Sequence, residues 1–183
     1  STAKVKITAA TTVKVTFSPY KKVTFEKLDD YLKTANAASD GIYYIDVTDL
    51  AASDLKGVSW DDPSLLGKVL KANELKKVAL KLGAITGLTD MSWCFYHCTS
   101  LTRAPVIQSG VTDMRQCFGN CTSLSQAPVI PNGVTDMSYC FASCTSLTQA
   151  PDIPNSVTDM SSCFNTCTSL THAPVIPNSV TDM

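Results

Sequence analysis

The sequence lacks most of the features that mark an enzyme, a membrane protein or a nucleic-acid-binding protein. It has only two histidines, and no nucleophile, base and orienting acid can be assembled around them. It has no Gly-rich phosphate loop and no basic stripe with interleaved aromatics. No apolar run approaches the ~20 residues of a membrane-spanning helix. We therefore expect no catalytic residues, no cofactor, no nucleic-acid partner and no membrane span in this fragment.

Charge is nearly balanced over the whole chain, with 15 basic and 16 acidic residues, but it is unevenly placed. Before Leu88 there are 13 basic and 10 acidic residues, a formal charge of +3; from Leu88 onward there are 2 and 6, a charge of −4. All eight cysteines also lie after Leu88. No Gly/Ser/Pro-rich linker separates the two parts. Composition therefore divides the chain into residues 1–87 and 88–183 without indicating two independent domains.

What the second part contains is a repeat. The string Thr-Asp-Met recurs every 23 residues and ends at Met91, Met114, Met137, Met160 and Met183. The full motif reads VTDMSxCFxxCTSLTxAPVIPNS. A fixed period of this length is typical of a solenoid, in which each unit buries its apolar face only by stacking on its neighbours. Such an array offers a long surface and no deep catalytic pocket, so the pattern favours binding over chemistry.

Several columns of the repeat hold the same apolar residue type in every unit. We expect these columns to be buried and stacked, because close-packed interiors tolerate little change in volume. They are represented by Leu147, Ala150, Ile153, Val157, Met160 and Phe164.

The local pattern predicts a short extended segment followed by a short helical turn. Leu-x-x-Ala-Pro-x-Ile-Pro is too rich in proline for a long central strand, because each proline removes a hydrogen-bond donor. Thr-Asp-Met-Ser-x-Cys-Phe-x-x-Cys reads as a helical turn on the opposite side, with Thr or Asp as its N-cap. We interpret the Asp column as capping residues and not as a calcium site.

These residues carry a family resemblance. Leu-x-x-Ala-x-Val-Ile-Pro followed by Met-x-x-Cys-Phe-x-x-Cys-x-x-Leu resembles the treponemal, or BspA-like, class of leucine-rich repeats found on bacterial surface proteins. The resemblance covers Leu88 to Met183 and implies an α/β fold: a right-handed β-α superhelix of short strands and helical turns with an N-terminal α/β capping region. It also implies a cell-surface or secreted location.

Residues 1–87 contain altered versions of the same unit. Ile42–Leu50 and Leu75–Leu80 match the general strand pattern of leucine-rich repeats, and residues 61–73 have apolar residues at helical spacing. Ahead of them, Phe25, Leu28, Tyr31, Leu32 and Ala35 form one helical face, and Lys4–Phe17 alternates as a strand or hairpin would. We interpret 1–87 as two irregular repeat units and a cap over the start of the array.

The chain ends suggest a longer parent protein. Ser1 is not an initiator residue, and Met183 stops within a repeat, which would leave the last unit's core open. We therefore expect the 88–183 array to be truncated.

The cysteines form i, i+4 pairs beside the Phe column, as in Cys94/Cys98. Thiols are among the most buried side chains, and a solenoid core needs ladders of small apolar groups, so we favour buried free thiols. Disulfide bonds are the alternative to free thiols, because an exported chain meets an oxidising environment. Metal binding is the least favoured reading, and we predict no metal site.

The positions that vary between repeats should face solvent, where a partner can contact them. On the strand side the candidates are Arg103, Gln126, Gln149 and His172. On the helical side they are Trp93, Tyr96 and Tyr139, because exposed aromatics anchor protein and glycan contacts. Val106, Val129, Asp152 and Val175 vary beside the first set. The other variable positions on the helical side are Gln116, Gly119, Ala142, Ser162 and Asn165. Unselected drift on a bare surface would produce the same variation.

Three hypotheses follow for function. The resemblance favours a surface protein that binds host matrix proteins or other bacteria. A glycan-binding module would use the aromatics of the helical side, and a structural stalk would display another domain.

Overall fold

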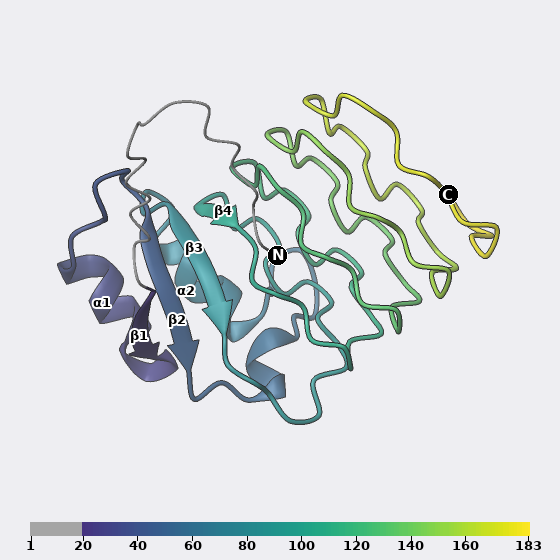
Figure 1. The fold of residues 1–183 in the computed structure, drawn as a ribbon. Coiled ribbons are helices and arrows are strands. Elements are labelled where there is room, and N and C mark those ends of the chain that lie inside the picture. The colour runs from purple at the N-terminus through teal and green to yellow at the C-terminus, as the bar shows by residue number, and fades with distance from the viewer. Residues whose placement is uncertain (1–19) are drawn as a thin grey trace, which may run out of the picture.

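The computed structural model describes residues 20–183, which form one elongated stack of coils beginning at a four-stranded sheet (Figure 1). The strand or hairpin expected over Lys4–Phe17 lies outside the described residues. Successive chain segments lie side by side along the stack from the sheet to the C-terminus. Within residues 20–183, no helix has the length and apolar character needed to cross a membrane.

The sheet is parallel and follows chain order. Its strands are β1 (Lys21–Thr24), β2 (Tyr43–Thr48), β3 (Val78–Leu82) and β4 (Leu101–Arg103). In β2 the apolar residues Tyr43, Ile45 and Val47 are buried and alternate with half-buried residues. That alternation places one face of the sheet on the core. β2 and β3 confirm the strands predicted from the repeat pattern in the first part of the chain.

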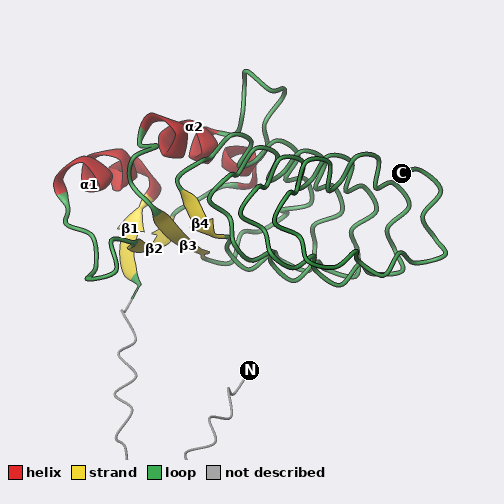
Figure 2. Ribbon diagram, turned by 90° about the horizontal axis from the view of Figure 1, so that it is seen from above, coloured by secondary structure: helices red, strands yellow, loops and turns green. Residues whose placement is uncertain are grey.

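Two helices cover the inner face of the sheet (Figure 2): α1 (Leu28–Thr34), continuous with a 3-10 turn at Phe25–Lys27, and α2 (Leu65–Ala72). A second 3-10 turn spans Ala52–Leu55. Leu28 and Leu32 of α1 are fully buried, which confirms the predicted helical face. α2 begins later than the predicted residue 61 because Ser64 is its N-cap, accepting a hydrogen bond from Gly67 N at 2.9 Å.

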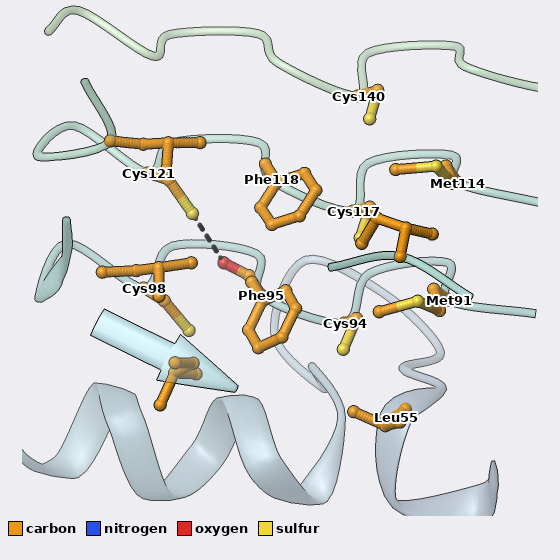
Figure 3. Close-up of a cluster of buried hydrophobic side chains, with 14 of the residues drawn as sticks. Leu55, Met91, Cys94, Phe95, Cys98, Met114, Cys117, Phe118, Cys121 and Cys140 are labelled. Atoms are coloured by element: carbon orange, nitrogen blue, oxygen red, sulfur yellow. Dashed lines mark hydrogen bonds between the residues drawn. The ribbon is translucent and has the colours of Figure 1, made fainter. Parts of the chain in front are cut away.

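The invariant columns of the array are stacked as predicted. The rings of Phe95, Phe118, Phe141 and Phe164 lie nearly parallel with centroids 5.3–5.6 Å apart. Figure 3 shows Phe95 beside Phe118 and Met91 beside Met114 in successive coils. The Leu, Val and Met columns are buried through the inner repeats. The expectation of burial is wrong for Ala150, Ile153 and Phe164, which are only partly buried, as are Ala104 and Ala127.

The prediction of a short helical turn in each repeat is wrong. The segment forms consecutive tight turns, closed by Cys94 N to Met91 O at 3.1 Å and Cys98 N to Phe95 O at 3.0 Å. The third residue of each turn is left-handed, with φ 58° at Trp93 and 61° at His97, and the later repeats repeat this geometry.

Hydrogen bonds between neighbouring coils explain why the segment forms tight turns and not a helix. The N–H groups of Trp93, Phe95 and His97 donate to carbonyls of the following repeat at 2.8–2.9 Å. A helix would direct these donors along its own axis. The double turn instead sends alternate donors to the neighbouring coil, so that each repeat is hydrogen-bonded to the next. We call this side of the array the turn side.

The Asp column caps these turns, as expected. Asp90 Oδ1 accepts a hydrogen bond from Ser92 N, and Asp136 Oδ1 one from Ser138 N, both at 2.8 Å. The backbone of the same column forms single parallel bridges from Asp90 through Asp182. The carboxylate thus stabilises the turn in the manner of an Asx-turn.

A substitution in α2 tests how the first part of the chain packs against the array. An alanine Cβ at Gly67 would lie 2.4 Å from Cys94 O, a backbone atom of the first regular repeat. Gly-to-Ala changes inside helices normally stabilise by about 1 kcal/mol. We expect Gly67→Ala instead to lower the free energy of unfolding by about 2 kcal/mol, because α2 must move off the repeat.

Urea unfolding checks this expectation, and Leu65→Ala is the matched control on the exposed side of the same helix. The control should change stability by less than about 0.5 kcal/mol. A Gly67→Ala protein as stable as the parent would show that α2 does not abut the array this closely.

Candidate functional site

The strand side of the array presents a row of exposed polar side chains. We call Arg103, Gln126, Gln149 and His172 the outer ladder; all four are exposed, as predicted. Each follows a Thr or Ser, and most of these hydroxyls bond to the preceding coil. Thr102 Oγ1 donates to Val78 O at 2.8 Å and Thr171 Oγ1 to Thr148 O at 3.2 Å. The backbone under the ladder is therefore fixed, while its side chains reach solvent.

A second row runs beside the outer ladder. It consists of Val106, Val129, Asp152 and Val175, which we call the valine ladder. The three valines are 81%, 84% and 88% exposed, and Asp152 is also exposed. Single exposed apolar residues are ordinary, but a row at constant spacing is typical of an interaction surface. The expectation that strand-side variable positions face solvent is therefore confirmed.

A groove of about 480 Å³ lies between two neighbouring coils of the valine ladder. Residues 127–132 form one wall and residues 149–154 the other. A smaller hollow beside it is lined by Gln126, Thr148 and Gln149 together with Ala127, Ala150 and Pro151. The two ladders run side by side as one strip, and between these two coils its hollows are lined by both polar and apolar side chains.

At the sheet, the outer ladder continues into an aromatic cluster that the sequence analysis missed. Tyr44 and Arg103 occupy one row across the strands, joined through Ala79. The Tyr20 and Tyr44 rings meet edge-to-face at 5.4 Å, and Lys81 Nζ lies 4.2 Å from the Tyr20 ring centroid. The signal in the sequence was Tyr44 at an outward position of an alternating strand.

Hydrogen bonding orders part of this cluster. Tyr44 OH donates to Asp40 Oδ2 at 2.7 Å. That bond lowers the pKa of the Asp40 carboxyl and raises the pKa of the Tyr44 hydroxyl, since it favours the ionised acid and the neutral phenol. The Tyr44 ring is thereby fixed on the outer face of the sheet.

The aromatic residues predicted on the turn side are less accessible. Trp93 and Tyr96 are half-buried, with their rings 5.0 Å apart. Trp93 packs against the segment between β2 and α2, because a Cβ on Gly57 would lie only 2.7 Å from Trp93 Cβ. Asn120 Nδ2 donates to Tyr96 OH at 3.0 Å. Trp93 thus contacts the segment before the array, and Tyr96 contacts the following repeat.

The expectation of exposure is wrong for Gly119 and Ala142, which are buried on the turn side. Gly119 is confined because a Cβ there would lie 2.7 Å from Gln116 Oε1 and 2.9 Å from the Tyr96 ring. Of the predicted turn-side aromatics, Tyr139 is the exposed one, at 42%. Trp60, which the sequence analysis did not single out, is 66% exposed in the segment before α2. Gly57 and Pro63 on either side of Trp60 are the sequence features that could have indicated an exposed loop there.

The cysteines belong to the core. All eight are free and buried. The second thiol of a repeat donates to the Phe carbonyl of the preceding repeat, as Cys121 Sγ does to Phe95 O at 3.0 Å (Figure 3). Cys144 and Cys167 repeat this contact at 3.1 and 3.0 Å. Within residues 20–183, no three or more Cys, His, Asp or Glu side chains gather in a metal-binding group.

Two carboxylates of the Asp column form ion pairs and have shifted pKa values. Lys56 Nζ lies 2.6 Å from Asp90 Oδ2, and Arg115 Nη2 lies 2.9 Å from Asp113 Oδ2. Burial opposes ionisation of Asp90, but hydrogen bonds from Lys56 and Ser92 outweigh it and lower its pKa. At Asp113 burial prevails and raises the pKa. These carboxylates cap turns and form no separate site.

The repeat array matches a known family of repeats. A family model described as a BspA type leucine rich repeat region matches residues 88–183 in six copies, just over half of the chain. The crystal structure of a leucine-rich repeat protein of T. pallidum is similar at 30% identity, with a TM-score of 0.49. That match covers 57% of this chain and 50% of the T. pallidum protein, so the aligned region spans half of its length. Comparison with curated proteins found no match.

Proposed function

We propose that this chain, which belongs to the BspA type leucine rich repeat family, is a bacterial surface or secreted protein that binds other proteins and catalyses no reaction. Leucine-rich repeat arrays generally supply extended binding surfaces, so protein binding is the general expectation for the fold. Adhesion to host matrix proteins or to other bacteria is the specific role that we propose.

The outer ladder with its flanking valine ladder is the main support for this proposal. The residues that vary between repeats on this side are exposed, although hydroxyl hydrogen bonds hold the coil beneath most of them. Arginine and aromatic side chains dominate the energetics of many protein interfaces. Arg103, Tyr20 and Tyr44 bring such groups to one end of the strip.

Glycan binding remains the alternative. It depended on the turn-side aromatics. Trp93 packs near Gly57, and Tyr96 packs near Gly119 and Asn120, so neither ring offers much free surface to a sugar. Tyr139 is the turn-side aromatic that a glycan can reach. The third hypothesis is a purely structural stalk. It would be consistent with surface variation that no binding partner has selected.

The full chain should first be screened against immobilised host matrix proteins and bacterial surface proteins, with a glycan array in parallel. We expect saturable binding to at least one protein. Binding to glycans alone would favour the alternative, and no binding in either screen would favour the stalk.

For the protein so identified, Arg103→Ala combined with Gln126→Ala should reduce affinity about tenfold or more, because these side chains lie on the proposed contact strip. Calorimetry or surface plasmon resonance measures the change. Tyr139→Ala probes the turn side, and His97→Ala, at an exposed turn-side position, is the control. Trp93→Ala is unsuitable, because it would disturb the contact with Gly57. Full affinity in the ladder variant together with loss in Tyr139→Ala would place the contact on the turn side.

A further inference from the structure

The valine ladder has one departure from its pattern. Val106, Val129 and Val175 share a column with Asp152, so a carboxylate replaces an isopropyl group in one coil. Asp152 is exposed, and none of the ion pairs or side-chain hydrogen bonds found within residues 20–183 involves it. By contrast, the Asp column of the repeat is engaged in capping. Asp152 therefore holds a charge that the folding of its own coil does not use.

This carboxylate lies in the wall of the 480 Å³ groove. Pro128, Val129 and Ile130 come from one coil, and Pro151, Asp152 and Ile153 from the next. The volume falls within the range of roughly 300–1,000 Å³ that is usual for ligand sites. The groove thus combines apolar walls with an acidic group and with the side-chain amides of Gln149 and Asn132.

A groove with apolar walls and one carboxylate is suited to bind a long basic side chain. Lysine and arginine carry an apolar stem and a charged head, and they place the stem along apolar surface while the head stays near water. A wholly apolar side chain would leave the carboxylate unpaired, and an acidic one would be repelled by it. A side-chain amide such as that of Gln149 can accept a further hydrogen bond from a cationic head.

We propose that this groove receives a lysine or arginine side chain of the protein partner, with its stem along Pro128 and Val129 and its head at Asp152. The inference rests on the proposed protein-binding function and adds the chemistry of one contact. Since the other three positions of the column are valine, Asp152 also sets the register: the basic residue of the partner is received at this coil.

The test uses short acetylated, amidated peptides that differ only at a central residue: lysine, arginine, norleucine or glutamate. Norleucine keeps an apolar stem like that of lysine and lacks the charge. Each is titrated to millimolar concentration into the 15N-labelled full chain, and amide shifts are followed by NMR. We expect lysine and arginine to shift the amides of residues 127–130 and 149–153. They should bind about two- to fivefold more tightly than norleucine, within the range measured for exposed ion pairs. Glutamate should bind least.

The matched variant is Asp152→Val, which installs the residue that the other coils carry and should leave the fold intact. It should abolish the preference for lysine over norleucine. Asp136→Asn removes an acid elsewhere in the array while keeping the turn acceptor for Ser138 N, and it should preserve the preference. Equal binding of lysine and norleucine, a preference that survives in Asp152→Val, or no shifts in the groove would each overturn the inference. The proposed function would stand in those cases, because its test concerns the outer ladder and a whole protein.

Discussion

Raising the pH from 8 to 10 under reducing conditions is expected to remove most of the stability of the fold. Burial raises the pKa of seven of the eight thiols, that of Cys163 to about 12. In the unfolded chain a thiol titrates near pH 8.5. Above that pH the unfolded state releases protons that the folded state retains, so stability is present below about pH 8.5 and is lost as pH rises.

The expected loss is about 2 kcal/mol between pH 8 and 10 for each deeply buried thiol. Three or four such thiols are enough to offset most of the 5–15 kcal/mol that is typical of a domain. Urea unfolding at several pH values measures the slope. The variant Cys140→Ala loses some packing at every pH. Above pH 8.5, however, its free energy of unfolding should fall less steeply with pH, by about 1.4 kcal/mol per pH unit.

All eight cysteines are buried, so their thiols should react slowly with Ellman's reagent at pH 8 and completely after denaturation. No free thiols in the denatured chain would indicate disulfides. A free energy of unfolding that stays constant from pH 8 to 10 would show that the cysteines are solvated in the fold.

Truncation of one stacked ring should destabilise the array nearly as strongly. Phe118 is fully buried, and its ring stacks on Phe95 at 5.3 Å and on Phe141 at 5.5 Å. Phe118→Ala leaves a cavity between two coils, which costs about 3–5 kcal/mol in comparable cores. Urea unfolding at neutral pH measures the change.

Two controls separate stacking from a general effect of truncation. Phe164→Ala should cost clearly less, because Phe164 is half-buried and its ring stacks only on Phe141 among the described residues. Val129→Ala, at an exposed position, should change stability by less than about 0.5 kcal/mol. A loss at Phe118 no larger than that at Phe164 would contradict the stacked column.

The repeat period carried most of the information about the fold. Columns such as Phe and Met could be assigned to the core because each side chain meets its own counterpart in the next coil. The turn side could not be predicted in the same way. Ser-x-Cys-Phe-x-x-Cys has helical spacing, but Trp93 and His97 take left-handed conformations because alternate N–H groups bond to the next coil. That preference depends on contacts between coils, which a local pattern does not contain.

Variation between repeats was a good guide to exposure on the strand side and a poor one on the turn side. Gln126 and Gln149 vary and are exposed, whereas Gly119 and Ala142 vary and are buried. Gly119 is small because Tyr96 of the preceding coil fills the space beside it. A position can therefore vary because its neighbour varies. Trp93 illustrates the same limit, because it packs against Gly57, which lies before the array and outside the repeat.

The most direct test of the account is to block one face at a time. Because the native cysteines are buried, a single introduced cysteine can be labelled selectively with a bulky maleimide. Gln149→Cys places the label on the outer ladder, and Asn165→Cys places it at an exposed position on the turn side. The account predicts that the label at position 149 abolishes binding of the identified protein, while the label at 165 leaves it unchanged. Unimpaired binding with position 149 labelled, and loss with position 165 labelled, would contradict it.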